Sequence, residues 1–385
     1  MSGVLFAAVL VAYFFFFYMP RDQDAKRNST NFDQVAIDPY THKLHNSLFI
    51  ADLHADSLLW ARDLKKGHGY GHVDIPRMLQ GNLGLQVFSI VTKSPKNLNL
   101  FENDDRTDNI KLLSIVQRWP VYTWNSLYGR AAYQSQKLHD LQAAVPSFRI
   151  IKYKEDLQQF IVDKQSRNRL AAGILSLEGG HALEGDLENV ERLFDAGVRI
   201  IGFAHFFDNR LGGSAHGLKK GGITDFGLKV LKEMERLSIL VDIAHASPAL
   251  IDDIFTHTTR PVIATHTGVQ AICNRSPRNL TDEQIKQVAD SKGVVGIGFW
   301  TDAICSSQVK GIVDTIRYVT DLVGEDHVAL GSDFDGNVQT PFDAAHMIVL
   351  TQALLDAGFT ESQIKKVMGD NVRRLLLENL PARMH

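Results

Sequence analysis

Short apolar runs recur along the chain and alternate with longer amphipathic segments. The runs are rich in Val, Ile and Leu and nearly continuous, which is typical of strands covered on both faces. Strands that alternate with helices indicate a parallel sheet, and eight repeats predict an α/β fold of the (β/α)8 TIM-barrel class. A doubly wound open sheet is the alternative. The eight runs span residues 48–56, 83–91, 171–180, 198–205, 238–247, 261–268, 293–300 and 327–336.

Three segments between these runs have the periodicity of amphipathic helices. They cover residues 186–197, 225–238 and 281–293. The last segment begins with Thr281, a residue type that caps helix N-termini, and ends at Gly293, a residue type that favours helix ends. We therefore expect surface helices at these three places.

The distance between the second and third runs is unusually long. About 80 residues separate Val91 from Ala171, which is too many for one crossover helix. Residues 92–170 are therefore expected to form a helical, aromatic-rich insertion between strands 2 and 3. Its aromatic residues either pack into a small core of their own or form a lid or a dimer surface. They are Trp119, Tyr122, Trp124, Tyr128 and Tyr133.

An uncharged apolar stretch lies near the N-terminus, at residues 3–19. Seventeen residues are at the short end of the range that spans a membrane. No basic residue precedes the stretch and no small-residue cleavage site follows it, so residues 1–20 are expected to form an uncleaved anchor; an export signal is the alternative. Residues 21–45 are expected to be a polar linker, and residues 46–385 the barrel domain.

Composition narrows the classes of function. The net charge is −3 and the basic residues form no cluster, so nothing favours nucleic-acid binding. Only Cys273 and Cys305 are present, which excludes a disulfide framework or a Cys-rich zinc site. We expect two buried thiols, with one disulfide bond as the alternative if the domain is exported.

Ionisable side chains stand at the carboxyl ends of six of the eight predicted strands. In a barrel these ends converge on one mouth, where the active sites of TIM barrels lie. One such histidine would more often be structural, but six coincident ends indicate a single functional site. His54 and Asp56 lie two apart on a strand, so they share a face and can act as one chelating arm. The end residues are His54, Asp56, Glu178, His205, His245, His266, Asp333 and Asp335.

Three histidines, an aspartate and a glutamate from this set suit zinc, manganese or iron. Five donors exceed the needs of one catalytic zinc, because such an ion keeps a position open. Two metal ions that share a carboxylate would use all five donors and activate a water between them.

Seven motifs in this order resemble those of the membrane (renal-type) dipeptidases, the zinc peptidase M19 branch of the amidohydrolase superfamily. Each motif alone is weak, but their order and spacing agree from about residue 48 to residue 377. The motifs are DLHAD, LSLEGG, GFAHFFDN, VDIAHAS, IATHTG, PRNLTD and GSDFDG.

The resemblance implies a (β/α)8 barrel with two Zn²⁺ ions per chain. His54 and Asp56 would bind one zinc, and His245 and His266 the other. Glu178 would bridge the two ions.

The resemblance also implies roles toward a dipeptide substrate. Arg278 would bind the C-terminal carboxylate, and His205 would contact the substrate and stabilise the developing oxyanion. Asp333 would move protons and meet the substrate amine. A tyrosine that family members can place after the seventh strand is missing here, so Trp300 or a loop residue is expected in its place.

The expected function is hydrolysis of dipeptides, including those with a D-residue at the C-terminal position, by a hydroxide that bridges two zinc ions. One alternative is a related hydrolase acting on lactams, lactones or N-acyl amino acids. Another is an inactive, membrane-anchored binding protein. Basic residues after the anchor favour a cytoplasmic domain, but the export common in the family favours an extracellular or periplasmic one. A homodimer is a further family-based expectation.

Several neighbouring polar residues are expected to have supporting roles. Asp52 is expected to orient a metal ligand from behind, and Asp335 to support its loop. Two residues after the fourth strand are expected to shape that loop, and three histidines in Gly-rich loops to be solvated. These are Asp208 and Asn209, and His68, His72 and His216.

Overall fold

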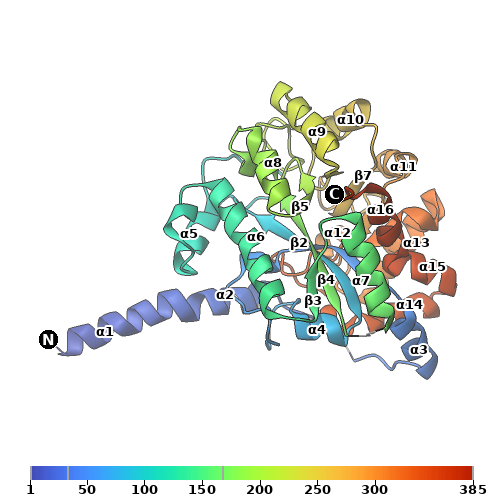
Figure 1. Cartoon of the computed structure of the whole chain (residues 1–385), viewed down its shortest axis with the longest axis horizontal. Coiled ribbons are helices and arrows are strands. Elements are labelled where there is room, and N and C mark those ends of the chain that lie inside the picture. Colours follow the sequence, from blue (N-terminus) through green and yellow to red (C-terminus); the bar gives the residue numbers. More distant parts are fainter. Residues whose placement is uncertain (1, 33, 167–168, 384–385) are drawn as a thin grey trace.

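The computed structural model describes residues 2–32, 34–166 and 169–383. Eight parallel strands close into a barrel, and the helices surround it (Figure 1). The ring is closed by pairing of β1 with β9 and of β2 with β4, so the expected TIM barrel is confirmed. The strands are β1 (Ile50–Ala55), β2 (Leu83–Val91), β4 (Ala171–Glu178), β5 (Val198–Gly202), β6 (Leu240–Asp242), β7 (Val262–Thr267), β8 (Val295–Ile297) and β9 (Val328–Leu330).

A ninth strand, β3 (Phe148–Ile150), lies outside the ring. It pairs with Ala171–Gly173 at the beginning of β4, whereas β5 pairs with β4 from Leu175 onward. The sequence did not predict β3 because three residues with a half-exposed middle position make no recognisable apolar run.

The three amphipathic segments form helices as expected. They are α8 (Glu188–Asp195), α9 (Asp225–Leu237) and α11 (Asp282–Asp290). The Thr281 side chain accepts a hydrogen bond from the Gln284 backbone, which gives α11 a complete capping box. Further helices are α4 (Ile75–Gln80), α10 (Pro248–His257), α12 (Thr301–Ile304), α13 (Val309–Val323), α14 (Ile348–Asp356), α15 (Glu361–Lys365) and α16 (Asn371–Asn379).

The described part of the insertion contains three α-helices, α5 (Asn109–Val116), α6 (Leu127–Ala144) and α7 (Lys154–Ser166). Some of its aromatic residues pack into a small core, as one of the two expectations had it, and others lie at the surface. The rings of Trp119 and Tyr133 lie 5.0 Å apart in a small cluster that also holds residues from the end of β2 and the loop after β1. Tyr122, in contrast, is 59% exposed.

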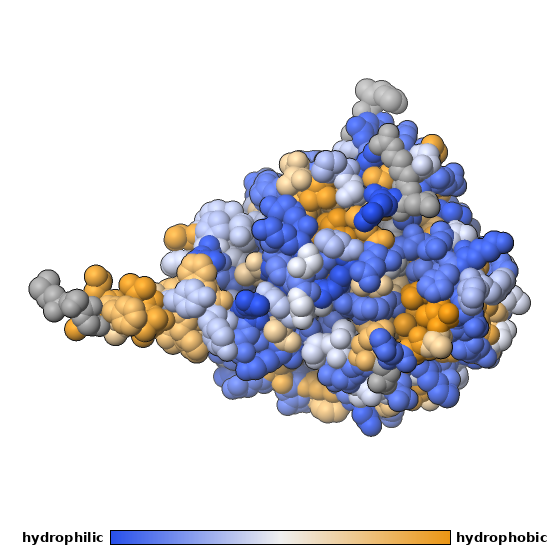
Figure 2. Space-filling model, turned by 90° about the horizontal axis from the view of Figure 1, so that it is seen from below, coloured by the Kyte–Doolittle hydropathy of each residue, from blue (hydrophilic) through white to orange (hydrophobic). Residues whose placement is uncertain are grey.

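The apolar N-terminal segment is helical and projects from the barrel (Figures 1 and 2). It consists of α1 (Ser2–Tyr13), a π-helical turn at Phe14–Tyr18 and α2 (Met19–Arg27). By length and composition, Val4–Arg27 can span a membrane, with 24 residues and a mean hydropathy of 1.8 for its most apolar window. Only 6% of that window is buried against the rest of the chain.

The segment expected to be a polar linker, residues 21–45, packs against the barrel. It contains the end of α2 and most of α3 (Pro39–Ser47). Asp24 forms a buried ion pair with Arg62, with 2.7 Å between Oδ2 and Nε. The polar residues of this segment make contacts with the barrel. A solvated linker would have the same composition, so the sequence alone could not separate the two cases.

Cys273 and Cys305 form a disulfide bond, so the expectation of two free buried thiols is wrong. Cys273 is fully buried, while Cys305 lies at the end of α12 and is exposed. The bond connects the loop after β7, which carries Arg278, to the loop after β8.

The imidazole of His45 in α3 is a buried group that should make stability depend on pH. Its Nδ1 lies 2.9 Å from Thr351 Oγ1 and its Nε2 lies 3.1 Å from the Gly81 carbonyl oxygen. Burial lowers the pKa of His45 from 6.5 to about 4. The unfolded chain therefore binds this proton near pH 6.5 and the folded chain only near pH 4, so acid favours unfolding across that interval.

We expect His45→Gln to be less stable than the native chain at pH 7.5 because its buried hydrogen bonds change. As the pH falls to 4.5, the native chain should lose about 2 kcal/mol relative to the variant, since only the native chain titrates here. Urea unfolding followed by circular dichroism at both pH values measures this difference. His42→Gln, at an exposed position of the same helix, is the control. A difference between His45→Gln and the native chain that stays constant with pH would contradict the prediction.

Candidate metal centre

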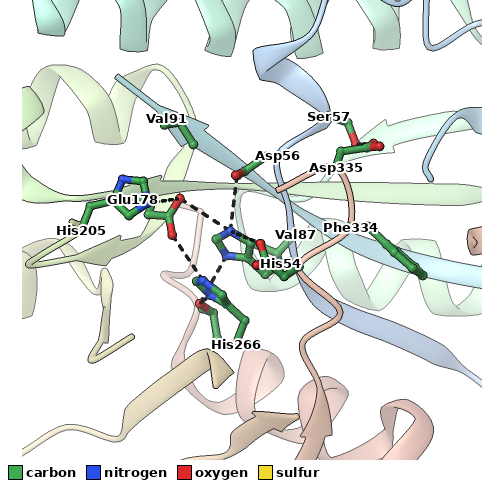
Figure 3. Close-up of polar contacts among 12 residues, drawn as sticks. His54, Asp56, Ser57, Val87, Val91, Glu178, His205, His266, Phe334 and Asp335 are labelled. Atoms are coloured by element: carbon green, nitrogen blue, oxygen red, sulfur yellow. Dashed lines mark hydrogen bonds and ion pairs between the residues drawn. The ribbon is translucent and has the colours of Figure 1, made fainter. Parts of the chain in front are cut away.

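Predicted site residues, four of them metal ligands and one the substrate-contacting His205, converge at the carboxyl ends of the strands (Figure 3). His54 lies in β1, Glu178 is the last residue of β4, and His266 lies in β7. His205 and His245 each follow their strands by three residues. All five side chains are buried at the mouth of the barrel.

The carboxylate of Glu178 lies in the middle of the group, and its two oxygens face different histidines. Oε1 is 3.1 Å from His245 Nε2 and 3.3 Å from His266 Nε2. Oε2 is 3.7 Å from His54 Nε2 and 3.6 Å from His205 Nε2. One carboxylate therefore connects two clusters of potential ligands.

His54 also contacts two aspartates. Its Nε2 is 3.3 Å from Asp56 Oδ1 and 3.9 Å from Asp333 Oδ1. Three groups of side chains have ligand atoms within 4.8 Å of one another: His54, Glu178 and His266; Glu178, His205 and His245; and His54, Asp56 and Asp333. The structure thus brings together all five predicted ligands with the two predicted catalytic residues.

The spacing and the unpaired atoms fit metal binding. Two ligands on a tetrahedral zinc at roughly 2.0–2.1 Å are about 3.4 Å apart, close to the separations around Glu178. His54 Nε2, Asp56 Oδ1 and Glu178 Oε2 are buried and have no hydrogen-bond partner within the described chain. Buried polar atoms are almost always paired, so these atoms fit a site built for cations.

The electrostatics of the group also fit cations. Burial, followed by the charge of Asp56, raises the pKa of Glu178 well above its usual value, and burial raises that of Asp56. Burial lowers the pKa values of His245 and His266, so both imidazoles are neutral, which is the form that binds metals. Divalent cations would stabilise the carboxylates in their charged form.

Arg278 lies beside this group but makes no ion pair within it. Its guanidinium is buried, with Cζ 5.1 Å from the centre of the Trp300 ring, and one nitrogen donates to the His266 carbonyl. Its Nε has no hydrogen-bond partner in the described residues. The side chain therefore has an unused donor at the edge of the centre.

The family assignment rests on the whole barrel. The model of the membrane dipeptidase family (peptidase family M19) matches residues 40–383. The chain belongs to the membrane dipeptidase family. It is thus a metal-dependent dipeptidase, and its closed barrel matches known members of the family.

Three known proteins are similar to this chain, the third of them in fold. The dipeptidase aclJ of Aspergillus oryzae is 27% identical over 351 residues, which cover 85% of this chain and 77% of that protein. The crystal structure of dipeptidase AC, an M19 metallopeptidase, is 25% identical with a TM-score of 0.70, covering 87% of this chain and 100% of that one. A metallopeptidase of Rhodobacter sphaeroides, solved with a phosphinate mimic of L-Ala-D-Ala, is 23% identical with a TM-score of 0.70, covering 86% and 99%.

Two residues that the sequence did not suggest orient a histidine of this dipeptidase. Asp242 Oδ2 accepts a hydrogen bond of 2.6 Å from Thr265 Oγ1, which lies 2.9 Å from His266 Nδ1. Because the Thr265 hydroxyl donates to Asp242, the Thr265 oxygen accepts a hydrogen bond from the protonated Nδ1 of His266. His266 Nε2 then keeps its lone pair toward Glu178. The available signal was the aspartate inside the motif VDIAHAS.

Asp52 acts differently from its expected role. Its oxygens accept hydrogen bonds of 2.7 Å from both the backbone nitrogen and the hydroxyl of Ser332, and one of 2.6 Å from Gln86 Nε2. Asp52 therefore holds Ser332, the residue before Asp333, in place. No hydrogen bond joins it to the imidazole ring of a predicted ligand within the described residues. Asp333 itself has a left-handed backbone with φ 60°, and His245 has φ 64°. Such conformations are concentrated at functional sites.

The remaining supporting residues fall into two groups. Asp335 lies beside Ser57 and accepts a hydrogen bond from its hydroxyl (Figure 3). It also accepts bonds from Arg62 and the His72 backbone, so its expected role in supporting its loop is confirmed. The expectation of solvated loop histidines is wrong for His72 and His216, which are fully buried. His72 bonds to Ser29 and Asp335, and these distant partners replace water.

His68 is half-buried. Asp208 and Asn209 bond to the backbone of their own loop, as expected.

Proposed function

We propose that this dipeptidase is a binuclear zinc enzyme in which Glu178 bridges the two ions. His54 and Asp56 would bind one zinc, and His245 and His266 the other. The observation that carries this assignment is the position of Glu178, whose two oxygens face different histidines. Imidazole and carboxylate donors together suit zinc, manganese or iron, and zinc is the ion that we propose.

When bound, two zinc ions would supply a water that loses its proton near neutral pH and would polarise the scissile carbonyl group. Arg278 would orient the substrate, because a guanidinium can bind a carboxylate through two parallel hydrogen bonds. Trp300 packs against this guanidinium and would restrict its movement.

Asp333 and His205 would handle the charges that change during hydrolysis. Burial raises the pKa of Asp333 to about 7, so this carboxyl can hold a proton near neutral pH and give it to the leaving amine. Burial lowers the pKa of His205, so its neutral ring can donate a hydrogen bond to the tetrahedral oxyanion.

The proposed substrates are dipeptides with a free carboxylate, including those with a D-residue at the C-terminal position. The phosphinate mimic of L-Ala-D-Ala in the Rhodobacter sphaeroides metallopeptidase supports this substrate class. We further propose that the apolar segment at residues 1–20 anchors the enzyme, with the barrel outside the cytoplasm. The disulfide bond supports this side, because such bonds persist in oxidising compartments. Full protease protection of the barrel in intact cells would contradict it.

Metal content and turnover together test the function. The purified full chain should contain about two equivalents of zinc, and it should hydrolyse L-Ala-L-Ala and L-Ala-D-Ala. A chelator should abolish hydrolysis, and added zinc should restore it. Less than one equivalent of metal in an active enzyme would contradict the binuclear centre. Turnover of a lactone or an N-acyl amino acid without any dipeptide hydrolysis would favour the related hydrolases, and no turnover at all would favour a binding protein.

A further inference from the structure

A cavity of about 290 Å³ opens directly beside the metal centre. Asp56 and His205, which belong to the metal centre, line it, and most of its remaining wall is apolar. Trp60, from the loop after β1, and Ile110 and Leu113, from α5, belong to one packed cluster and contribute to this wall. The metal centre needs no such apolar space, so the cavity is available for another part of the substrate.

The helix α2 closes the same cavity through Met19, Gln23 and Arg27. It is fixed to the catalytic loops by buried charges. Asp24 binds Arg62, and Arg62 Nη2 lies 2.6 Å from Asp335 Oδ1, two residues beyond Asp333. Both partners of each pair are buried, so displacing α2 would remove Asp24 from Arg62, which is one of the two carboxylates paired with this buried guanidinium.

A second set of contacts joins α2 to the loop after β9. Arg27 Nη1 donates to Asn337 Oδ1 over 3.1 Å, and the Asn337 backbone nitrogen donates to Asn28 Oδ1 over 3.0 Å. Asn337 itself lines the cavity. The helix α2 and the loop after β9 therefore form one continuous part of the cavity wall. The same helix directly follows the apolar N-terminal segment.

The orientation of a dipeptide follows from the position of Arg278. This arginine lies against His266 and Trp300, none of which lines the cavity. A substrate with its carboxylate at Arg278 and its peptide bond at the metal centre would direct its amino-terminal residue toward Asp56. The cavity begins at that place.

We propose that the cavity binds a large apolar side chain on the amino-terminal residue of the substrate, and that α2 forms one wall of this specificity site. The proposal rests on the dipeptidase function proposed above and deepens it. It also gives the N-terminal segment a second role, because the helix that continues the anchor then selects the substrate.

The test compares dipeptides that differ only in their amino-terminal residue. The full chain, loaded with zinc in detergent, should show a kcat/KM for Leu-Ala and Phe-Ala roughly tenfold higher than for Gly-Ala. Met19→Glu should reduce this preference about tenfold, because it places a charge in the apolar wall. Lys26→Gln changes the net charge equally but lies on the exposed side of α2, and should keep the preference.

A second pair of variants tests the part of the wall that α5 forms. Leu112 lines the cavity and is 52% exposed, and Val121 is 70% exposed on the same insertion but does not line it. Leu112→Glu should reduce the preference, whereas Val121→Glu should not. Dipeptide hydrolysis without any preference, or an equal effect of test and control variants, would overturn this inference alone. Absence of dipeptide hydrolysis by the native chain would instead overturn the proposed function.

Discussion

Replacing Glu178 by Gln should lower kcat/KM for dipeptides about a thousandfold and release most of the bound metal. The amide keeps only one oxygen, so it cannot face both histidine pairs with an acceptor as the carboxylate does. Its NH₂ group would also point toward a cation. Because metal ions contribute several kcal/mol to stabilising the transition state, losing them corresponds to about three powers of ten in rate.

Zinc content by atomic emission and kcat/KM for L-Ala-L-Ala measure the two effects in the same preparations. Glu188→Gln, at an exposed position of α8, makes the same chemical change away from the centre and should retain both metal and rate. Circular dichroism establishes that both variants are folded. Two equivalents of zinc with native activity in Glu178→Gln would show that this carboxylate does not bridge the ions.

The barrel was predictable because its strands are covered on both faces, so each appears as an apolar run. The cluster of candidate metal ligands was predictable for the opposite reason. Residues such as His54 and Glu178 interrupt apolar surroundings at strand ends, where burial of a charge requires a partner. The apolar run of a strand and the charged residue at its end can both be read from a few neighbouring positions, without knowing how the loops fold.

Features that depend on distant partners were not predictable. Thr265 looks like an ordinary β-branched strand residue, and its role becomes visible only with Asp242 beside it. His72 is buried because Ser29 reaches it from the N-terminal segment. The disulfide bond joins cysteines 32 positions apart, and their distance depends on how two loops fold.

The N-terminal segment shows the same limit. Its composition is that of an anchor followed by a polar linker, and the apolar half matches this expectation in length and exposure. The polar half bonds to the barrel through Asp24 and Arg27, whose partners lie 38 and 310 positions away in the sequence. A charged surface helix and a solvated linker have the same composition, so only the fold distinguishes them.

Replacing Arg278 by Met should remove the preference of the enzyme for substrates with a free carboxylate. The native enzyme should cleave Ala-Ala about a thousandfold faster, in kcat/KM, than the dipeptide amide, because a buried cation left unpaired by the amide disfavours its binding. In Arg278→Met the ratio between the two substrates should approach one. Arg278→Lys should keep part of the preference, since an ammonium retains the charge but lacks the two-pronged geometry.

Arg275→Met provides the matched control, because Arg275 lies three residues earlier in the same loop and is exposed. Its ratio of acid to amide hydrolysis should equal that of the native enzyme. Metal content separates a binding defect from damage to the centre, which is relevant because Arg278 donates to the His266 carbonyl. If Arg278→Met retains its zinc and still prefers the free acid, another group binds the carboxylate. The orientation of the dipeptide, and with it the direction in which its amino-terminal side chain points, would then have to be reversed.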